Sequence, residues 1–277
     1  MKIDLQGKVA LVTGGGAGIG KGIVDAFAEL GATLVVAEIE EAKCKALREE
    51  LGDDALVAQI DVRDAAQVAA LPEQIAERFG RLDVLVNNVG HHLGIFNSFE
   101  DSTEAEWEGL YDINLKHMFI VSRAMIPLMK HSAGVNGGGS IINISSIEGF
   151  RGYPGSVAYT TFKHAVTGFT RALAMQLAGD QIRVNLIGPE TTETEQVQVQ
   201  GRVRPEYWEA ANRTIPLGRY GRPSDHAGAA VFLATELSAW VTGMCMIIDG
   251  GGLTAGGFQR TPDGKWTIMP VVSDRAY

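Results

Sequence analysis

Short apolar runs alternate with longer amphipathic stretches along most of this chain. The apolar runs, rich in β-branched residues, cover residues 8–13, 33–37, 56–60, 82–86, 140–144, 182–187 and 244–248. The stretches with helical periodicity cover residues 20–30, 41–51, 65–79, 104–130, 156–178 and 224–237. Such short apolar runs are typical of buried parallel strands. The alternation predicts an α/β fold, in which right-handed crossovers place helices on both faces of a parallel sheet.

The pattern changes after the sixth apolar run. Residues 190–217 lose clean periodicity and carry several glutamates and arginines. This is typical of a mobile lid beside the strand ends, with a plain pair of surface helices as the alternative. Residues 253–277 show no helical period, so we expect either a disordered tail or an arm that packs on a neighbouring subunit. Because no repeat or linker divides the rest, residues 1–252 are expected to form one domain.

Composition and charge narrow the function classes. The chain has 277 residues, of which 45% are hydrophobic, and a formal net charge of −9. This acidity argues against nucleic acid or an anionic membrane as a partner. The first residues do not resemble a signal peptide, and no apolar run approaches the ~18 residues of a membrane span. Cys44 and Cys245 give no disulfide framework, so we expect a cytoplasmic protein. With nucleic acid and membrane disfavoured, we expect it to act on a small molecule.

A glycine-rich loop directly follows the first predicted strand. Gly14, Gly18 and Gly20 stand in the run Gly-Gly-Gly-Ala-Gly-Ile-Gly, which ends where an amphipathic helix begins. Glycines let a phosphate approach the backbone closely, and a helix N-terminus offers free N–H groups and a positive dipole end. This strand–loop–helix context is that of a dinucleotide fingerprint. We therefore predict a pyrophosphate site here, with a plain tight turn as the alternative.

The second predicted strand ends in Glu38, eighteen residues after Gly20. An acidic side chain at about this distance meets the hydroxyls of the adenosine ribose. The same carboxylate would repel the additional phosphate of NADP, and no Arg or Lys follows within the next four residues. The sequence therefore favours NAD over NADP as the cofactor, with a solvated charge at a strand end as the alternative for Glu38.

Other polar residues mark further strand ends. Asp61 follows the third apolar run, and Asn87-Asn-Val-Gly90 follows the fourth. Because ligands bind at the carboxyl ends of such strands, Asp61 and Asn87 are expected to bond adenine or to brace neighbouring loops. Asn114 stands inside a helical stretch. A buried amide there can bend the helix and hold a water, or it can simply satisfy core groups.

Tyr159 and Lys163 stand four residues apart in a predicted helix, so their side chains share one face. A nearby cation favours the phenolate and is expected to lower the pKa of Tyr159 from its usual value near 10. Ser146 ends the fifth apolar run, and a loop with several glycines can return its hydroxyl to the phenol. The Tyr-x-x-x-Lys motif alone also fits an exposed tyrosine and a solvated lysine on a surface helix.

Taken together, these residues resemble the short-chain dehydrogenase/reductase family over residues 5–252. The motifs that carry the resemblance are Thr13-Gly-x-x-x-Gly18-Ile-Gly20, Asn87-Asn-Val-Gly90, Asn114, Ser146, Tyr159-x-x-x-Lys163, Val184-Asn185 and Asp249-Gly-Gly. The resemblance implies a doubly wound (Rossmann) fold with a seven-stranded parallel sheet. It also implies a homo-oligomer, either a tetramer or a dimer.

The resemblance also implies a role for each residue that matches a motif. Tyr159 would be the catalytic acid/base, and Lys163 would lower its pKa and bind the nicotinamide ribose. Ser146 would hold the substrate oxygen, and Asn114 would hold a water in the proton relay. The implied cofactor-binding residues are Gly14, Gly18, Ile19, Gly20, Glu38, Asp61, Val62, Asn87, Gly90, Tyr159, Lys163, Pro189, Thr192 and Thr194.

Two positions depart from the family pattern. Val89 replaces the usual Ala, and Glu190 follows Pro189 where the family commonly has Gly. If that glycine serves for its backbone freedom, Glu190 requires a different local path, and the contacts assigned to Thr192 and Thr194 change with it.

The residues expected around the substrate are His91, His92, Glu148, Tyr153 and Glu190. Several of them are polar, which favours a polar or mid-sized cyclic alcohol over a bare acyl chain. The adjacent histidines do not predict a metal site, because neighbouring side chains diverge and no further ligand is placed.

The function predicted from the sequence is the NAD-dependent interconversion of a secondary alcohol and a ketone, with Tyr159 as the acid/base. One alternative is a 3-oxoacyl-carrier-protein reductase that uses NADPH, against which Glu38 and the net charge of −9 argue. The other alternative is a cofactor-binding protein without catalysis. The intact set of Ser146, Tyr159 and Lys163 with Asn114 disfavours that alternative.

Overall fold

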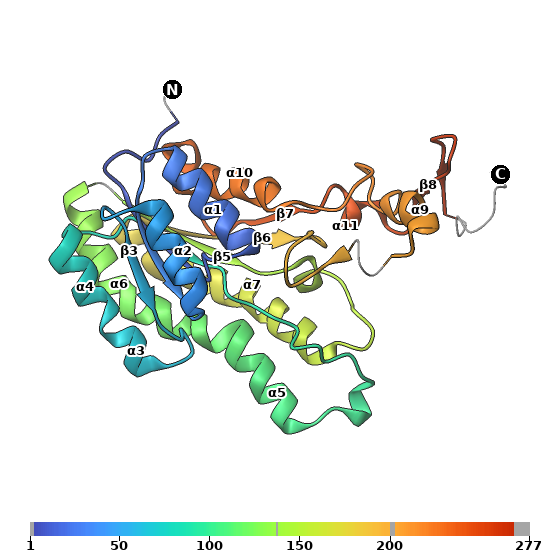
Figure 1. The fold of residues 1–277 in the computed structure, drawn as a ribbon, viewed down its shortest axis with the longest axis horizontal. Helices are drawn as coiled ribbons and strands as arrows, with labels where there is room; N and C mark the ends of the chain where they lie inside the picture. The colour runs from blue at the N-terminus through green and yellow to red at the C-terminus, as the bar shows by residue number, and fades with distance from the viewer. Residues whose placement is uncertain (1–2, 137, 200–202, 269–277) are drawn as a thin grey trace.

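A seven-stranded parallel sheet forms the centre of the molecule (Figure 1). The computed structural model describes residues 3–136, 138–199 and 203–268. The strands are β1 (Val9–Thr13), β2 (Thr33–Glu38), β3 (Leu56–Gln59), β4 (Val84–Asn87), β5 (Gly139–Ile144), β6 (Ile182–Pro189) and β7 (Cys245–Ile248). Their order across the sheet is β3-β2-β1-β4-β5-β6-β7, and all neighbours run parallel. The predicted doubly wound fold is confirmed.

Helices cover both faces of this sheet and bury two separate apolar layers. The main helices are α1 (Gly18–Glu29), α2 (Glu41–Leu51), α4 (Leu71–Phe79), α6 (His117–Asn136), α7 (Val157–Leu177) and α10 (Pro223–Ala234). One layer joins α1, α2 and α10 to Ala10 and Val12 of β1. The other joins α4, α6 and α7 to Val9 and Leu11 of the same strand. Successive residues of a strand point to opposite faces, so β1 is apolar throughout because both of its faces are buried.

Two predicted helices are interrupted. Residues 65–79 divide into α3 (Ala65–Ala69) and α4, because Pro72 has no N–H and is accommodated only in the first turn of a new helix. The second stretch consists of α5 (Glu104–Tyr111), a π turn (Asp112–Lys116) and α6, which continues to residue 136. Asn114 lies in the π turn, so the helix is irregular at the amide where a bend was expected.

The segments after β6 and β7 carry short regular elements. A 3₁₀ turn (Pro205–Tyr207) leads into α9 (Trp208–Asn212) in the segment after β6. After β7 follow α11 (Gly252–Ala255) and a hairpin of β8 (Gln259–Arg260) and β9 (Trp266–Thr267). Figure 1 shows α9 and β8 toward the same end of the molecule, beyond the sheet. Residues 253–268 thus contain a short helix and a hairpin, whereas 200–202 and 269–277 lie outside the described residues.

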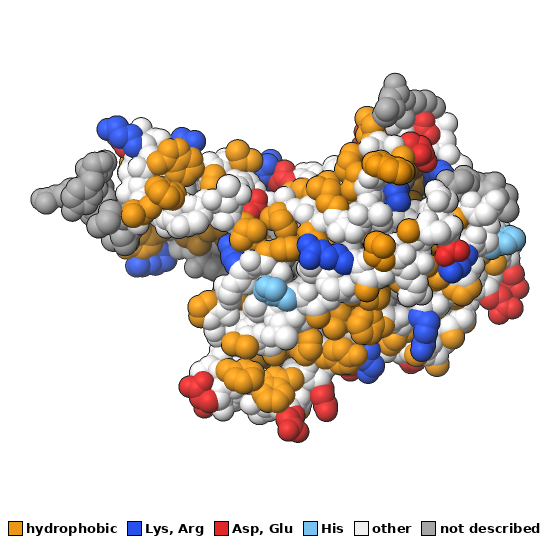
Figure 2. Space-filling model, turned by 180° about the vertical axis from the view of Figure 1, so that it is seen from behind, with side chains coloured by type: hydrophobic (Ala, Val, Ile, Leu, Met, Phe, Trp, Pro, Cys, Tyr) orange, Lys and Arg blue, Asp and Glu red, His pale blue; other side chains and the backbone are white. Residues whose placement is uncertain are grey.

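The surface carries uncovered apolar side chains. Figure 2 shows hydrophobic side chains gathered in the middle of one face of the molecule. Among the exposed apolar residues are Phe119 of α6 and Met175 of α7, which are 39% and 78% exposed. Such areas are typical of protein contact surfaces. None of the helices in the described ranges is long and apolar enough to cross a membrane.

Candidate active site and cofactor site

The glycine-rich loop joins β1 to α1 in a conformation that requires glycine. Gly14 and Gly18 have φ of 63° and 55°. A Cβ on Gly20 would lie 2.2 Å from the carbonyl oxygen of Gly14. Helix α1 has no side-chain cap and no acidic residue in its first turn, while Ile19 packs partly against the core. The N–H groups and the dipole of α1 are therefore available to an anion, and the loop fits the pyrophosphate of a dinucleotide.

Glu38 ends β2 beside this loop and is only 6% exposed. Its carboxylate accepts N–H hydrogen bonds from Gly16 at 3.0 Å, Ile39 at 2.8 Å and Glu40 at 3.1 Å. These three bonds fix the carboxylate against the loop. A phosphate on the adenosine ribose would meet this negative charge there, whereas ribose hydroxyls could donate to it.

The two asparagines after β4 take different positions. Asn87 is fully buried, and its amide donates to a serine of α6 at 3.1 Å and to Asn143 of β5 at 2.9 Å. It therefore braces the sheet beneath the site. Asn88 donates to two carbonyl oxygens at the start of the glycine-rich loop, at 3.0 and 3.1 Å. Sequence reasoning misses this role of Asn88, although its place directly after a strand is the signal.

Asp61 and Val62 lie where β3 ends, at the outer edge of the sheet. The side-chain hydrogen bond from Arg63 lowers the pKa of Asp61, and the two groups pair at 2.7 Å. Val62 is 5% exposed and packs in the core. The Asp61 carboxylate is thus engaged within the chain, and contact of either residue with adenine stays a prediction.

Ser146 and Tyr159 bring two hydroxyls together from separate elements. Ser146 follows β5 and begins a 3₁₀ turn (Ile147–Gly149), where its Oγ accepts the N–H of Glu148 at 3.2 Å. Tyr159 lies in the first turn of α7, with its hydroxyl close enough to the Ser146 side chain for Ser146 to lower the pKa of Tyr159. The loop between the two residues therefore returns as its glycines suggest, and one substrate oxygen can bind both hydroxyls.

Burial sets the pKa values of Tyr159 and Lys163. It raises the pKa of Tyr159 to about 12, although the hydrogen bond from Ser146 acts in the opposite direction. It lowers the pKa of Lys163 to about 8. The Lys163 ammonium lies over the Tyr159 ring, 5.5 Å from the ring centroid. The expectation that Lys163 lowers the tyrosine pKa is wrong for the protein alone, because loss of solvation dominates and Lys163 is not among the groups that shift this pKa.

Asn114 holds the loop after β4 in place. Its amide donates to the carbonyl oxygens of His91 at 2.8 Å and Leu110 at 3.0 Å, and its Oδ1 accepts the N–H of His91 at 3.2 Å. Gly90 is packed beside it, since a Cβ there would lie 2.8 Å from Nζ of Lys163 and 3.3 Å from the Asn114 oxygen. Asn114 therefore lies near Lys163, with its side chain bonded to the loop backbone.

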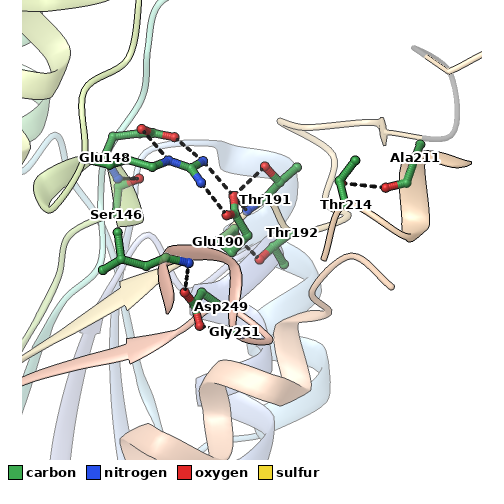
Figure 3. A network of polar contacts seen from close by, with 11 residues as sticks. Ser146, Glu148, Glu190, Thr191, Thr192, Ala211, Thr214, Asp249 and Gly251 are labelled. Atoms are coloured by element: carbon green, nitrogen blue, oxygen red, sulfur yellow. Dashed lines mark hydrogen bonds and ion pairs between the residues drawn. The ribbon is translucent and has the colours of Figure 1, made fainter. Parts of the chain in front are cut away.

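An ion-pair cluster lies beside Ser146 (Figure 3). Arg151 donates to Glu148 at 2.9 and 3.2 Å and to Glu190 at 2.9 and 3.1 Å. Both glutamates are buried, with 9% and 7% exposure. Glu190 follows Pro189, the last residue of β6, and does not have a positive φ. Arg151 thus accommodates the unusual glutamate, and sequence reasoning misses this arginine because its partners lie on separate segments.

The segment after β6 passes over the glycine-rich loop. The methyl group of Thr194 lies 3.3 Å from where a Cβ on Gly18 would stand. The Thr192 hydroxyl is instead buried, bonded to the carbonyl oxygen of Glu190 at 2.8 Å and to Nε2 of His226 at 2.7 Å. Of the two predicted threonines, Thr194 therefore lies beside the cofactor loop, while Thr192 anchors the segment to α10.

A row of aromatic rings extends from the loop after β4. The rings of His91 and His92 lie 4.9 Å apart, so the expected divergence is wrong. Their Nδ1 atoms accept backbone N–H groups of the same loop at 2.6 and 2.9 Å, which turns both rings back toward it. Phe96 lies 4.8 Å from His92 and 6.1 Å from Tyr153. No group of three or more metal-binding side chains gathers in the parts of the chain that the structure describes.

Comparison with known proteins identifies the class of this site. A family model described as Enoyl-(Acyl carrier protein) reductase matches residues 14–252. The chain is similar to the crystal structure of a 3-ketoacyl-(acyl-carrier-protein) reductase from Brucella melitensis complexed with NADH, at a TM-score of 0.81 and 32% identity, covering 90% of this chain and 100% of that one. The fold and site define an oxidoreductase that binds a nicotinamide cofactor. More particularly, the chain belongs to the short-chain dehydrogenase/reductase family.

The relatives differ in what their names say they act on. The 3-oxoacyl-[acyl-carrier-protein] reductase FabG of Thermotoga maritima is 36% identical over 89% of this chain and 98% of its own. The 3alpha-hydroxysteroid dehydrogenase of Mediterraneibacter gnavus is 38% identical over 90% of this chain and 98% of its own. The structure of levodione reductase matches with a TM-score of 0.81 and 31% identity, over 91% and 99% of the two chains. Family membership therefore leaves the substrate open.

Proposed function

We propose that this protein is an NAD-dependent oxidoreductase that interconverts a secondary alcohol and a ketone. The observation that carries the proposal is that the side chains of Ser146 and Tyr159 lie together, with the buried Lys163 over the tyrosine ring. These groups can hold one substrate oxygen and move one proton. Alcohol oxidation requires both at the oxygen atom.

Each residue has a distinct task in this proposal. Ser146 donates to the substrate oxygen and holds it against Tyr159. A bound nicotinamide cofactor would supply the acceptor for the hydride of the alcohol carbon and, in the reverse direction, the hydride donor for the ketone. Tyr159 takes the hydroxyl proton during oxidation and gives it back during reduction, a contribution of about 10²–10⁴ in rate. Lys163 would bind the nicotinamide ribose, and Asn114 would continue the proton relay through a water.

NAD, rather than NADP, is the cofactor that the adenosine end of the site favours. The fixed carboxylate of Glu38 would repel a ribose phosphate. Lys43, a cation near the loop, pairs with Glu40 at 2.9 Å and with Glu195 at 3.1 Å. This lysine is therefore already engaged and has little capacity to bind a phosphate. The pyrophosphate would lie at the start of α1, with Thr194 on its other side.

A ring-bearing alcohol is the substrate class that we favour. The row of His91, His92, Phe96 and Tyr153 offers an aromatic surface of rings tilted against one another, and its last two members are 48% and 40% exposed. Aromatic rings bury large apolar area against a ring-shaped ligand. The relative named 3alpha-hydroxysteroid dehydrogenase supports the same substrate class.

A 3-oxoacyl-carrier-protein reductase that uses NADPH is the second candidate. The name of the Thermotoga maritima relative favours it. Glu38 argues against it, because its carboxylate repels an extra phosphate on the cofactor, and Lys43 is already paired with two glutamates and does little to offset that repulsion. A cofactor-binding protein without catalysis is disfavoured, since Ser146, Tyr159 and Lys163 are all in place.

We further propose a single domain over residues 1–252, with residues 190–217 as a lid, in a homo-oligomeric protein of the cytoplasm. Lys43 on α2 pairs with Glu195, so the start of the lid already contacts the cofactor side. The edge strand β7 is partly exposed along its length, and Phe258 and Trp266 near the hairpin are about half exposed. These surfaces favour contact with a second copy of the chain.

The test is cofactor reduction by the purified full chain with a panel of secondary alcohols. We expect cyclic alcohols to reduce NAD at least about tenfold more efficiently than NADP. Faster NADPH oxidation with a β-ketoacyl thioester would support the second candidate instead. Cofactor binding without turnover of any alcohol or ketone would contradict catalysis itself.

A further inference from the structure

The cluster of Glu148, Arg151 and Glu190 carries a net negative charge. Two carboxylates share one guanidinium through four hydrogen bonds between 2.9 and 3.2 Å. One negative charge therefore remains after pairing, and no second cation pairs with either glutamate within the described residues. Asp249 lies close by, since a Cβ on Gly252 would be 2.9 Å from Glu190 and 3.8 Å from Asp249. This end of the site is negative overall.

That charge lies next to the reacting hydroxyls. The N–H of Glu148 donates to the Ser146 hydroxyl at 3.2 Å, and Figure 3 shows the two residues side by side. Burial is the largest cause of the raised pKa of Tyr159, and Ser146 acts against it. The charge of Glu148 is a further cause that raises this pKa. A substrate whose oxygen binds Ser146 and Tyr159 therefore comes within electrostatic reach of the cluster.

Arg151 has little capacity to bind an anionic substrate. A guanidinium has five N–H groups, and four of them already donate to the two glutamates. The two parallel bonds by which arginine normally binds a carboxylate are thus taken by the protein's own side chains. The guanidinium charge is neutralised by the two glutamates, so an approaching anion is repelled by the net negative charge of the cluster.

We infer that the cluster of Glu148, Arg151 and Glu190 selects substrates by charge. The site accepts uncharged alcohols and ketones and rejects those that carry a carboxylate close to the reacting carbon. This inference rests on the proposed function and narrows its substrate class. Repulsion between like charges is several times stronger in a partly desolvated site than in bulk water, and it acts on the choice between substrates.

The test compares two alcohols that differ mainly in charge. They are methyl 2-hydroxycyclohexanecarboxylate and the free acid, in which the carboxyl group lies on the carbon next to the reacting one, offered to the full-length enzyme at saturating NAD. We expect kcat/KM to be at least about tenfold higher for the ester, a difference of about 1.4 kcal/mol. Glu148→Gln and Glu190→Gln keep the side-chain shape and should each reduce this ratio at least about threefold, by improving the acid.

A matched control removes a negative charge elsewhere. Asp180 pairs with Lys130 at 2.7 Å just before β6. It therefore lies at the amino ends of the strands, whereas Ser146 lies at their carboxyl ends. Asp180→Asn changes the net charge of the chain by the same amount as the glutamine variants. Because this charge is far from the reacting hydroxyls, the ratio of ester to acid should stay at the wild-type value.

Two outcomes overturn the inference. One is equal use of ester and acid by the wild type. The other is an unchanged ratio in both glutamine variants, provided that they retain NAD binding. If those variants do not fold, salt supplies the second measurement. Raising the ionic strength should narrow the wild-type ratio because it screens the charge. If the ratio of kcat/KM for the ester to that for the acid did not change with ionic strength, this would contradict charge selection.

Failure of the proposed function would look different. In that case no secondary alcohol reduces the cofactor, so the ester and the acid are compared by calorimetric binding to the enzyme–NAD complex. Tighter binding of the ester, lost in Glu148→Gln, would support charge selection in a site without turnover. Equal binding of the two compounds, or binding of neither, would reject it.

Discussion

The cofactor half and the substrate half of this site are built in different ways. Beside β1 and β2, main-chain geometry dominates: Gly20 has no room for a Cβ, and three N–H groups hold the carboxylate of Glu38. Beyond β5 and β6, side chains from separate segments meet, as where Arg151 joins Glu148 to Glu190. In our proposal the main chain holds the cofactor, whereas exchangeable side chains select the substrate.

Removing the tyrosine hydroxyl should have the largest effect, because it should abolish catalysis in the substrate half while cofactor binding in the other half is retained. Tyr159→Phe deletes the proposed acid/base but leaves the glycine-rich loop intact. We expect kcat to fall by about 10³-fold, within the range for general acid–base catalysis, with NAD affinity changed less than about threefold. Steady-state kinetics and calorimetry measure the two quantities. Tyr111→Phe removes a hydroxyl in α5 and should keep wild-type activity; retained activity in Tyr159→Phe would contradict the assigned role.

Adding one methyl group to the loop should disable the cofactor half alone. In Gly20→Ala the new Cβ would lie 2.2 Å from the carbonyl oxygen of Gly14, so the loop must shift. We expect NAD affinity to fall by about 100-fold, because the N–H groups no longer meet the pyrophosphate together. Gly228→Ala, with open space around its Cβ in α10, is the matched control. Equal NAD affinity in both variants would reject the loop as the pyrophosphate site.

Neutralising Glu38 should relax the choice of cofactor. Glu38→Gln keeps an oxygen that can accept N–H bonds but removes the charge that a ribose phosphate would meet. We expect the ratio of kcat/KM for NAD to that for NADP to fall by about tenfold. Glu41→Gln, at the first residue of α2, removes the same charge at an exposed position and should leave the ratio unchanged. An identical ratio in both variants would remove the basis for NAD preference.

The buried lysine should make stability depend on pH. Burial lowers the pKa of Lys163 to about 8 from an ordinary value of 10.5. Between these values the unfolded chain binds more protons than the folded chain, so the free energy of unfolding rises with pH there. From pH 8 to pH 10 we expect a rise of about 2 kcal/mol that is missing in Lys163→Met. Urea unfolding measures it.

The control for this effect is an exposed lysine. Lys45 has 78% of its side chain exposed on α2. Lys45→Met should therefore keep the pH dependence of the wild type between pH 8 and pH 10. If the wild type and Lys163→Met changed in parallel with pH, the ammonium of Lys163 would not be desolvated in the folded protein.

The parts of the site that local sequence defines could be predicted. The sheet, the glycine-rich loop and the place of Glu38 follow from short segments, because apolar runs specify strands and glycines specify close backbone approach. The neighbourhood of Ser146 and Tyr159 also follows, since a strand end and a glycine-containing loop lie between them. These features depend on residues close together in the chain.

The parts that depend on distant residues could not be predicted. Arg151 takes its role from Glu190, 39 residues later, and Thr192 takes its role from His226 on α10. The pKa of Tyr159 moves in the direction opposite to the one expected, because four-residue spacing shows a neighbouring cation but does not show burial. Only the folded chain reveals how much solvent each group loses.

The central claim is hydride transfer between an alcohol carbon and NAD, and isotope transfer tests it most directly. The best alcohol of the panel is prepared with deuterium on the hydroxyl-bearing carbon and oxidised by the purified enzyme. The reduced cofactor is then analysed by mass spectrometry. Our account predicts one deuterium per molecule of NADH formed. Reduced cofactor that contains no deuterium would contradict it.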